Sequence, residues 1–395
     1  MNKYCALVDL GLATQTDGTV TVCNQSRTLF TDPLGKTIRL DSHSIEDGWN
    51  SPTRQEIKQA LLNGQQHANC RDCWDEEAAG RSSIRTRANQ DYAEVRPMDQ
   101  PRVFMLKPGN ACNLTCRHCN PYVSSKWYKD HYTATQHTSN ITFKEYASRY
   151  DSIRDSFDDE NHLWDTLKKW NDGIVFYDLY GAEPLLINPL LEVLRHSVST
   201  GSSKHQDIHI NTNGTIWHDD FNTLFANFNH VELAVSIDGI ADQFEYMRYP
   251  ANWSKVLENL KRYQQLAQFN TSIKFSVCIT VSLLNVYYLI DYLNFFHSMG
   301  IETTVNIVHR PNYLNVRIAP QAVKQAIIDN LNIKRLTESS WDFKVKEIID
   351  YIRLDYEDPQ ELLKEFWRHT NLYDKLREQS YAEIFSEFYK VLTNE

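Results

Sequence analysis

Residues 102–310 alternate short apolar runs with amphipathic patterns, and this alternation constrains the fold more than any other feature of the sequence. Helical patterns are clearest at 190–199, 253–267 and 286–299. The apolar runs predict six strands, at 103–107, 174–179, 207–211, 231–237, 273–280 and 303–308. Strands that alternate with helices usually form a parallel sheet through right-handed crossovers. We therefore predict an α/β fold around a six-stranded parallel sheet.

The segments on either side differ in character and divide the chain into three predicted domains. Residues 1–95 predict a small irregular module, and RPMDQP at 96–101 predicts a linker. The central α/β domain spans 102–310 and contains a polar, aromatic insertion at 121–169. Residues 311–395 predict a helical C-terminal tail, whose aromatic residues recur at the spacing typical of packing.

Two local signals organise the N-terminal module. Residues 5–23 predict two short strands joined at Asp17-Gly18, a hairpin-turn dipeptide. The sequence SPTRQEIKQALLN at 51–63 predicts a helix with Pro near its start, and Gly64 follows as a C-cap.

The net charge of −10 argues against nucleic-acid binding by bulk electrostatics, which needs an excess of Lys and Arg. No run of about 18 apolar residues predicts a membrane span. The N-terminus MNKYCALVDL lacks the features of a signal peptide. We therefore expect a cytoplasmic protein, in a compartment where thiols stay reduced.

Three of the 8 cysteines, Cys112, Cys116 and Cys119, follow the first predicted strand in the sequence CNLTCRHC. Clustered thiolates are soft ligands that suit zinc or an iron–sulfur cluster. A structural metal site normally fills every position with protein, so three thiolates leave one position open for a reacting ligand. Ligands of α/β folds bind beyond the carboxyl ends of the strands, which is where this loop is expected.

The C-x3-C-x2-C spacing of this loop resembles the signature of the radical SAM enzyme superfamily. The resemblance implies a partial (β/α)6 TIM-like barrel and a [4Fe–4S] cluster on Cys112, Cys116 and Cys119. It also implies S-adenosylmethionine (SAM) as the remaining ligand, cleaved reductively to a 5′-deoxyadenosyl radical that abstracts hydrogen from a substrate. The alternative is a zinc-binding loop completed by His118 or His131.

Further segments resemble SAM-contacting motifs of that superfamily. Residues 180–184, YGAEP, resemble its GGEP motif with Ala in place of the second Gly, and NTNGT at 211–215 resembles its TNGT segment. SIDG at 236–239 resembles its S-x-DG segment, and MRYP lies at 247–250. The resemblance implies a SAM-binding set of His118, Tyr180, Gly181, Ala182, Glu183, Asn213, Ser236 and Arg248.

The resemblance and side-chain chemistry suggest roles for several members of this set. A carboxylate such as Glu183 suits the methionine ammonium, Ser236 suits the ribose, and Arg248 suits the carboxylate or forms a surface salt bridge. Asn213 and Asp238 either contact SAM or only shape turns.

A second cysteine group, Cys5, Cys23, Cys70 and Cys73, resembles the SPASM/twitch domains that carry auxiliary iron–sulfur clusters. The resemblance implies one auxiliary [4Fe–4S] cluster, here in an N-terminal iron–sulfur module that precedes the barrel. A four-thiolate zinc site is the alternative, because zinc uses the same ligands. Cys278 lies within an apolar run, which predicts a core residue.

The sequence does not identify the substrate. A peptide and a sugar- or cyclitol-type small molecule are both compatible, and a zinc-binding scaffold is the non-enzymatic alternative. A radical SAM enzyme implies an electron donor such as flavodoxin or ferredoxin. No catalytic base or radical relay can be selected, although Tyr122, Tyr180, His309 and Arg310 are expected near the barrel mouth.

Overall fold

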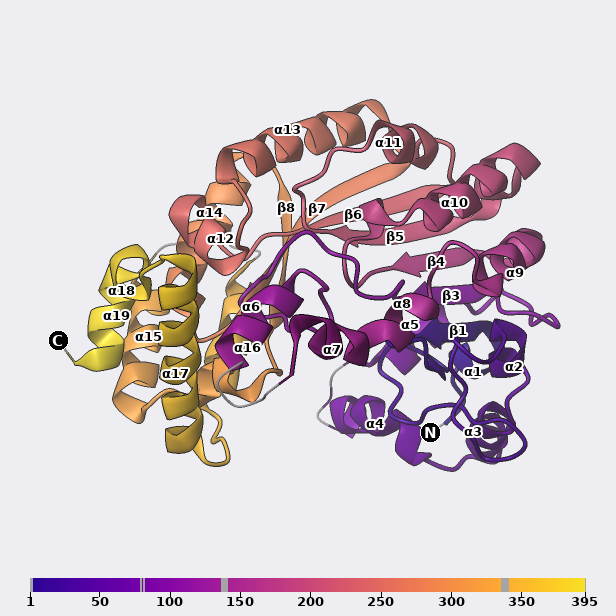
Figure 1. The fold of residues 1–395 in the computed structure, drawn as a ribbon, viewed down its shortest axis with the longest axis horizontal. Coiled ribbons are helices and arrows are strands. Elements are labelled where there is room, and N and C mark those ends of the chain that lie inside the picture. Colours follow the sequence, from indigo (N-terminus) through magenta and orange to yellow (C-terminus); the bar gives the residue numbers. More distant parts are fainter. Residues whose placement is uncertain (1–2, 79, 81, 136–140, 335–340, 395) are drawn as a thin grey trace.

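The computed structural model describes residues 3–394 apart from residues 79, 81, 136–140 and 335–340. Its centre is an eight-stranded sheet in the order β2-β1-β3-β4-β5-β6-β7-β8 (Figure 1). Every neighbouring pair from β1 to β8 is parallel. The six predicted strands are all present, as β3 Val103–Leu106, β4 Phe176–Leu179, β5 Asp207–Thr212, β6 His230–Ser236, β7 Ile273–Val281 and β8 Glu302–Ile307.

Two additional strands come from the N-terminal segment. β1, Gly11–Thr14, pairs parallel with β3, and β2, Val20–Thr21, pairs antiparallel with β1 across the predicted turn. The predicted class, an open α/β sheet of the partial-barrel type, is confirmed, but the sheet has eight strands rather than six. The N-terminal segment supplies backbone partners for the edge of β3, which would otherwise expose unpaired N–H and C=O groups.

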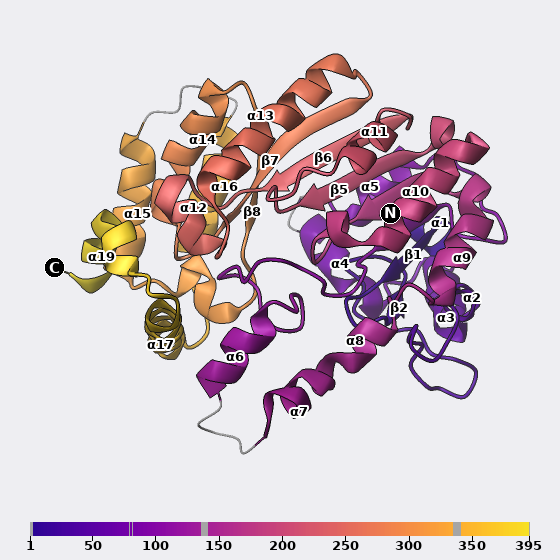
Figure 2. The ribbon, with the colours of Figure 1, turned by 45° about the horizontal axis from the view of Figure 1, so that its top comes forward.

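Helices cover one face of the sheet, where α10, α11 and α13 lie side by side (Figure 2). The three predicted helices are present as α10 Asn188–Thr200, α13 Trp253–Phe269 and α14 Leu289–Ser298. The other crossover helices are α9 His162–Trp170, α11 Asp219–Phe225 and α12 Ala241–Met247.

Strand β5 shows how the sequence separates the two faces. Ile208 and Ile210 are fully buried, whereas the alternate residues His209 and Asn211 are only partly buried. Successive side chains of a strand point to opposite faces, so apolar residues pack on one face and polar residues are left for the other. Asn211 on that polar face lines the cavity described below.

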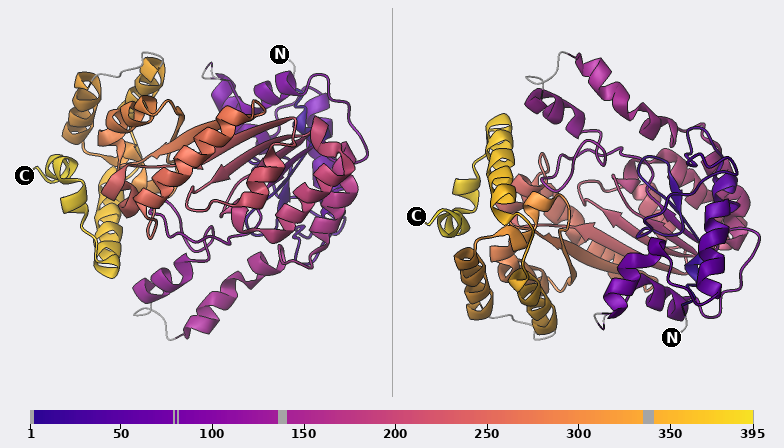
Figure 3. Two further views of the ribbon diagram at one scale, coloured as in Figure 1. Left: turned by 90° about the horizontal axis from the view of Figure 1, so that it is seen from above. Right: turned by 90° about the horizontal axis from the view of Figure 1, so that it is seen from below.

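The N-terminal segment packs five short helices around β1 and β2: α1 Leu7–Leu10, α2 Ile45–Trp49, α3 Pro52–Leu62, α4 Arg71–Ala78 and α5 Ile84–Asp91. α3 is the helix predicted at 51–63, and Gly64 after it has a φ of +75°, as its predicted C-cap role requires. The insertion forms α6 Trp127–Thr135, α7 Phe143–Ala147 and α8 Asp151–Asp155, which project at one margin of the molecule in both views of Figure 3.

The C-terminal residues form a helical group beside β8 (Figure 1), with α15 Gln321–Ile333, α16 Asp342–Arg353, α17 Pro359–Arg377, α18 Tyr381–Ile384 and α19 Ser386–Thr393. Phe366, Phe385 and Phe388 are fully buried, as predicted for packing residues, whereas Phe343 is exposed. None of the helices formed by the described residues combines the length and hydrophobicity of a membrane span.

Candidate active site

The cysteine loop leaves the carboxyl end of β3 and lines a cavity of about 480 Å³. Cys112, Cys116 and Cys119 all contribute to this cavity. So do seven of the eight residues expected to bind SAM, namely His118, Tyr180, Gly181, Ala182, Asn213, Ser236 and Arg248. These residues are up to 136 positions apart in sequence, and parallel strands bring them together because their carboxyl ends meet at one edge.

Backbone hydrogen bonds hold the cysteine loop against the segment that follows α12. The Thr115 N–H donates to the Tyr249 carbonyl at 2.7 Å, and the Arg117 N–H donates to the Met247 carbonyl at 2.8 Å. Within the loop, the Cys119 N–H donates to the Cys116 carbonyl at 2.9 Å. The spacing of the cysteines is therefore fixed by contacts with a distant part of the chain.

The three thiols fit a cationic iron–sulfur group. Burial, followed by the charge of Cys116, raises the pKa of Cys112 to about 11. A hydrogen bond with Cys119, followed by burial, raises the pKa of Cys116 well above its usual value. Buried thiolates are unfavourable without a positive partner, and bound iron supplies one. Cys112, Cys116 and Cys119 would hold the cluster, with the rest of the cavity available to SAM.

The turn after β4 combines two residues in the left-handed region. Gly181 has a φ of +81° and Ala182 a φ of +51°. Replacement of the motif's second glycine by Ala182 therefore places a Cβ where L-residues are disfavoured, at a cost of roughly 1 kcal/mol. The turn is held because the Glu183 N–H donates to the Ala111 carbonyl at 3.1 Å, which ties it to the cysteine loop.

Glu183 does not line the cavity and is fully buried behind it. Its carboxylate accepts hydrogen bonds from the Thr212 hydroxyl at 2.7 Å, the Asn213 N–H at 2.7 Å and the Leu185 N–H at 3.2 Å. Burial raises the pKa of Glu183, although these hydrogen bonds oppose the rise. In this structure Glu183 braces the turn after β5, and its expected contact with the methionine ammonium stays a prediction.

Polar groups at the ends of β5 and β6 face the cysteines. The Asn213 amide donates to Asn113 Oδ1 at 2.8 Å and lies 3.9 Å from the Cys112 sulfur. Asn213 Oδ1 also accepts a hydrogen bond from the Thr215 N–H. Asn213 therefore both shapes a turn and lines the cavity. The Ser236 hydroxyl donates to Asn211 Oδ1 at 2.6 Å.

Asp238, for which the sequence left a SAM contact and a turn as alternatives, and Ser282, which the sequence did not single out, both belong to the site. Asp238 Oδ2 lies 2.7 Å from Arg248 Nη2 and 3.5 Å from His118 Nδ1, and His118 Nε2 lies 3.0 Å from the Ser282 hydroxyl. The partner of Arg248 in this structure is therefore a buried carboxylate rather than a surface one. The SIDG segment carried a signal for Asp238, but no sequence signal pointed to Ser282.

The second cysteine group also converges. Cys5, Cys23, Cys70 and Cys73 line one small cavity between β2 and α4, together with Arg85. Burial raises the pKa of Cys23 to about 12 and that of Cys70 to about 11, and neighbouring thiolates add to both effects. A bound cation, either a cluster or zinc, would offset the cost of burying the four thiolates. Among the described residues, no group of three or more His, Cys, Asp or Glu is arranged for a single metal ion.

Tyr180 belongs to the part of the larger cavity that is nearest to the N-terminal segment. It lines the larger cavity, and burial, followed by the charges of Asp178 and Cys23, raises its pKa. The Lys107 ammonium lies 5.1 Å from the centre of the Tyr180 ring and donates to Gln15 of the N-terminal segment at 2.8 Å. The N-terminal segment therefore lies beside the Tyr180 side of the cavity, although it precedes the barrel in sequence.

Only some of the other residues expected at the barrel mouth line the cavity. His309 and Arg310 line the cavity, whereas Tyr122 does not and is 41% exposed. His131, a candidate zinc ligand, is also absent from the cavity lining, and its Nδ1 lies 2.9 Å from the Tyr146 hydroxyl. Cys278 is buried in β7, as predicted for a core residue.

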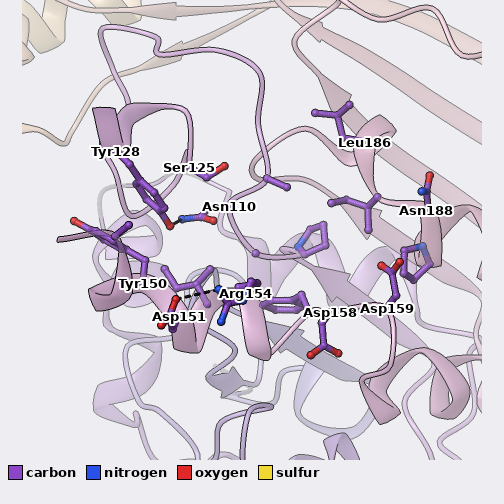
Figure 4. Close-up of a pocket in the computed structure, with 18 residues that line it drawn as sticks. Asn110, Ser125, Tyr128, Tyr150, Asp151, Arg154, Asp158, Asp159, Leu186 and Asn188 are labelled. Atoms are coloured by element: carbon purple, nitrogen blue, oxygen red, sulfur yellow. Dashed lines mark hydrogen bonds and ion pairs between the residues drawn. The ribbon is translucent and has the colours of Figure 1, made fainter. Parts of the chain in front are cut away.

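A separate cavity of about 570 Å³ lies against the start of the cysteine loop (Figure 4). Asn110 and Tyr128 line it and are joined by a hydrogen bond of 2.8 Å, while Asp151 and Arg154 form an ion pair of 3.1 Å on its other side. It contains none of the cysteines or residues expected to bind SAM.

Comparison with known proteins supports this site. Residues 106–282 match the family model described as the radical SAM superfamily. The matched segment contains the cysteine loop and strands β4 to β7. The matched segment is less than half of the chain, and the match supports a radical SAM enzyme that uses SAM and one [4Fe–4S] cluster. A search of curated proteins gives no match.

Several solved structures show distant similarity. One, described as native anSMEcpe with bound AdoMet, is 15% identical, with 64% of this chain and 62% of that chain covered and a TM-score of 0.38. SuiB from Streptococcus suis is 11% identical, with 88% of this chain and 70% of that chain covered and a TM-score of 0.37. The radical SAM methyltransferase TsrM from Kitasatospora setae is 13% identical, with 52% of this chain and 36% of that chain covered and a TM-score of 0.33. The present chain thus spans about three-fifths of anSMEcpe, and these similarities are too distant to indicate a substrate.

Proposed function

We propose that this chain binds SAM and a [4Fe–4S] cluster in the 480 Å³ cavity and cleaves SAM reductively. The supporting observation is that three cysteines and seven expected SAM contacts, which the sequence scatters over several strand ends, line this one cavity. When bound, the cluster supplies one electron that cleaves the SAM sulfonium, giving methionine and a 5′-deoxyadenosyl radical that abstracts hydrogen from the substrate.

The residues of the chain orient and shield this reaction. Ser236 and Asn211 offer hydrogen-bonding groups for the ribose, and the short turn at Gly181 lets backbone groups approach the ligand. Arg248 remains charged beside Asp238 and lies 4.0 Å from the Cys116 sulfur, so it supplies positive potential near the thiolates. Buried walls exclude water from the reactive species.

We further propose that Cys5, Cys23, Cys70 and Cys73 hold an auxiliary [4Fe–4S] cluster of the twitch type. Support comes from the convergence of the four cysteines on one cavity. Four protein ligands would leave no open iron, so electron transfer and stabilisation of the fold are its roles. Zinc is the alternative occupant that the metal analysis below distinguishes.

The substrate is an organic molecule with an abstractable hydrogen, either a peptide or a small molecule, and the electron donor is of the flavodoxin or ferredoxin class. The proposed location is the cytoplasm, where clustered thiols stay reduced and can bind metal.

The test uses anaerobically purified and reconstituted full-length protein. Iron, sulfide and zinc are quantified for each chain, then SAM and dithionite are added and 5′-deoxyadenosine is measured. About eight irons with 5′-deoxyadenosine would support two four-iron clusters. About four irons plus zinc would retain the enzyme and make the N-terminal site structural. Zinc without iron or SAM cleavage would support a zinc-binding scaffold instead.

A further inference from the structure

The C-terminal helix α17 reaches into the cysteine loop. Arg117 lies between Cys116 and Cys119, and its side chain is only 5% exposed. Its Nη2 lies 2.6 Å from Asp374 Oδ1 and 3.0 Å from Gln379 Oε1. A cation inside the loop is therefore paired with an anion more than 250 residues later in the chain.

Asp374 links the loop to two further elements. The Tyr246 hydroxyl of α12 donates to Oδ1 at 2.7 Å, and the Tyr381 N–H of α18 donates to Oδ2 at 2.8 Å. The Arg117 guanidinium also lies 4.0 Å from the centre of the Tyr246 ring. Both carboxylate oxygens are engaged, which restricts Asp374 to one position and Arg117 with it.

One helical turn further along α17, a second buried ion pair holds the segment that follows the loop. Arg377 lies 3.0 Å from Asp130 in α6, and its side chain is 1% exposed. Its guanidinium lies 4.6 Å from the Trp127 ring, and the edge of that ring packs on Tyr373 at 4.9 Å. The end of α17 therefore contacts both the cysteine loop and the helix that comes directly after it.

We propose that Asp374 is a positioning residue for the cluster-binding loop, which it holds through Arg117 while neutralising the charge of that arginine. The inference rests on the proposed function and extends it, because it assigns a role to the C-terminal extension. Breaking a buried ion pair on one side leaves an uncompensated charge, so loss of Asp374 is expected to loosen the loop and to leave a cation beside the cluster.

The first test measures loop position without a cluster. In the full-length apoprotein, alkylation of Cys116 by iodoacetamide is followed by mass spectrometry, since Cys116 is only 7% exposed. Asp374→Asn is expected to accelerate alkylation at least ~5-fold, because local opening exposes the thiol. The control is Glu361→Gln, an exposed position of the same helix that pairs only with Lys364 among the described residues. Equal rates in the two variants would overturn the positioning role.

The second test measures the midpoint potential of the SAM-binding cluster by redox titration with EPR detection. A reduced cluster carries one more negative charge, so an unpaired Arg117 in Asp374→Asn should shift the potential upward. Arg117→Gln leaves an unpaired anion and should shift it downward, and the double variant should lie between them. Asp374→Glu keeps the charge and should stay near wild type. Shifts of one sign in both single variants would contradict charge neutralisation and indicate general loosening alone.

The two tests separate this inference from the proposed function. If wild-type protein binds no cluster and does not cleave SAM, the proposed function fails, yet the alkylation test still decides whether Asp374 holds the loop. If wild-type protein cleaves SAM and Asp374→Asn changes neither alkylation nor potential, only the inference fails. Circular dichroism of each variant checks that it is folded.

Discussion

Arg248 and Asp238 form an ion pair of 2.7 Å in which the carboxylate is fully buried and the arginine is 9% exposed. His118, from within the cysteine loop, lies 3.5 Å from the same carboxylate. The pair therefore joins the end of β6, the segment after α12 and the cysteine loop. An unpaired buried charge is strongly unfavourable, so each member depends on the other.

This pair predicts how stability depends on pH. Burial alone would raise the pKa of Asp238, but the charge of Arg248 and the contact with His118 lower it from 3.8 to about 2. The folded pKa lies below the unfolded one, so the stabilisation is present above pH 3.8 and is lost as pH falls toward 2. The shift corresponds to about 2 kcal/mol. Urea unfolding of wild type should therefore lose about this much more stability between pH 4 and 2 than Asp238→Asn does.

Asp242→Asn is the matched control for that measurement, because Asp242 is an exposed carboxylate four residues later. It should keep the pH dependence of the wild type. Parallel pH profiles for wild type and Asp238→Asn would show that the carboxylate is not stabilised by Arg248.

Replacement of Cys112, Cys116 and Cys119 together by Ala should abolish 5′-deoxyadenosine formation. The same variant should lose about four of about eight irons, because only the SAM-binding cluster loses its ligands. Iron analysis and product chromatography on reconstituted protein provide the measurement. Cys278→Ser is the control, since this buried cysteine accepts a contact from the Asn306 amide and lines neither cysteine cavity. Continued SAM cleavage by the triple variant would rule out the assignment of the loop.

The double variant Cys70→Ser/Cys73→Ser should remove the metal of the N-terminal site but leave the SAM-binding cluster. Metal binding contributes directly to the stability of small metal-holding modules, so the melting temperature should fall by several degrees. SAM cleavage in the absence of substrate should remain within ~3-fold of wild type, because the other site is intact. Metal analysis and calorimetry provide the measurement, and unchanged iron and zinc contents would exclude these residues as ligands.

Ser236→Ala should raise the KM for SAM and leave kcat within about twofold. A neutral hydrogen bond contributes roughly 0.5–1.5 kcal/mol, which corresponds to a ~2- to 13-fold change in KM. Steady-state formation of 5′-deoxyadenosine at varied SAM concentration measures both constants. Ser298→Ala, at an exposed position of α14, is the control. A fall in kcat without a change in KM would argue against a binding role for Ser236.

The positions of the six central strands along the chain and the identity of the cysteine loop could be predicted because both are encoded locally. Alternating burial in β5 follows directly from Ile208 and Ile210, and the spacing of Cys112, Cys116 and Cys119 is a feature of eight consecutive residues. The side-chain periods of strands and helices depend only on the local backbone, so the sequence displays them without knowledge of the fold.

Other parts of the site could not be predicted because they depend on distant packing. Glu183 braces Asn213 after β5, a contact that no local pattern predicted, while its contact with SAM stays a prediction. Positive φ at Ala182 also became visible only in the folded turn. Hydrogen-bond partners of a polar residue are decided by which elements lie beside it, and no local pattern records them.

The sequence by itself determined an α/β sheet and two groups of cysteines, since periodicity and residue spacing are properties of short segments. The tertiary structure alone decided that β1 continues the sheet at β3, that each cysteine group lines a cavity of its own, and that Asp374 pairs with Arg117 inside the loop. These relationships join segments that are remote in the chain. They arise because burial of apolar surface determines which segments pack together. Buried charges are then stable only where this packing places an opposite charge beside them.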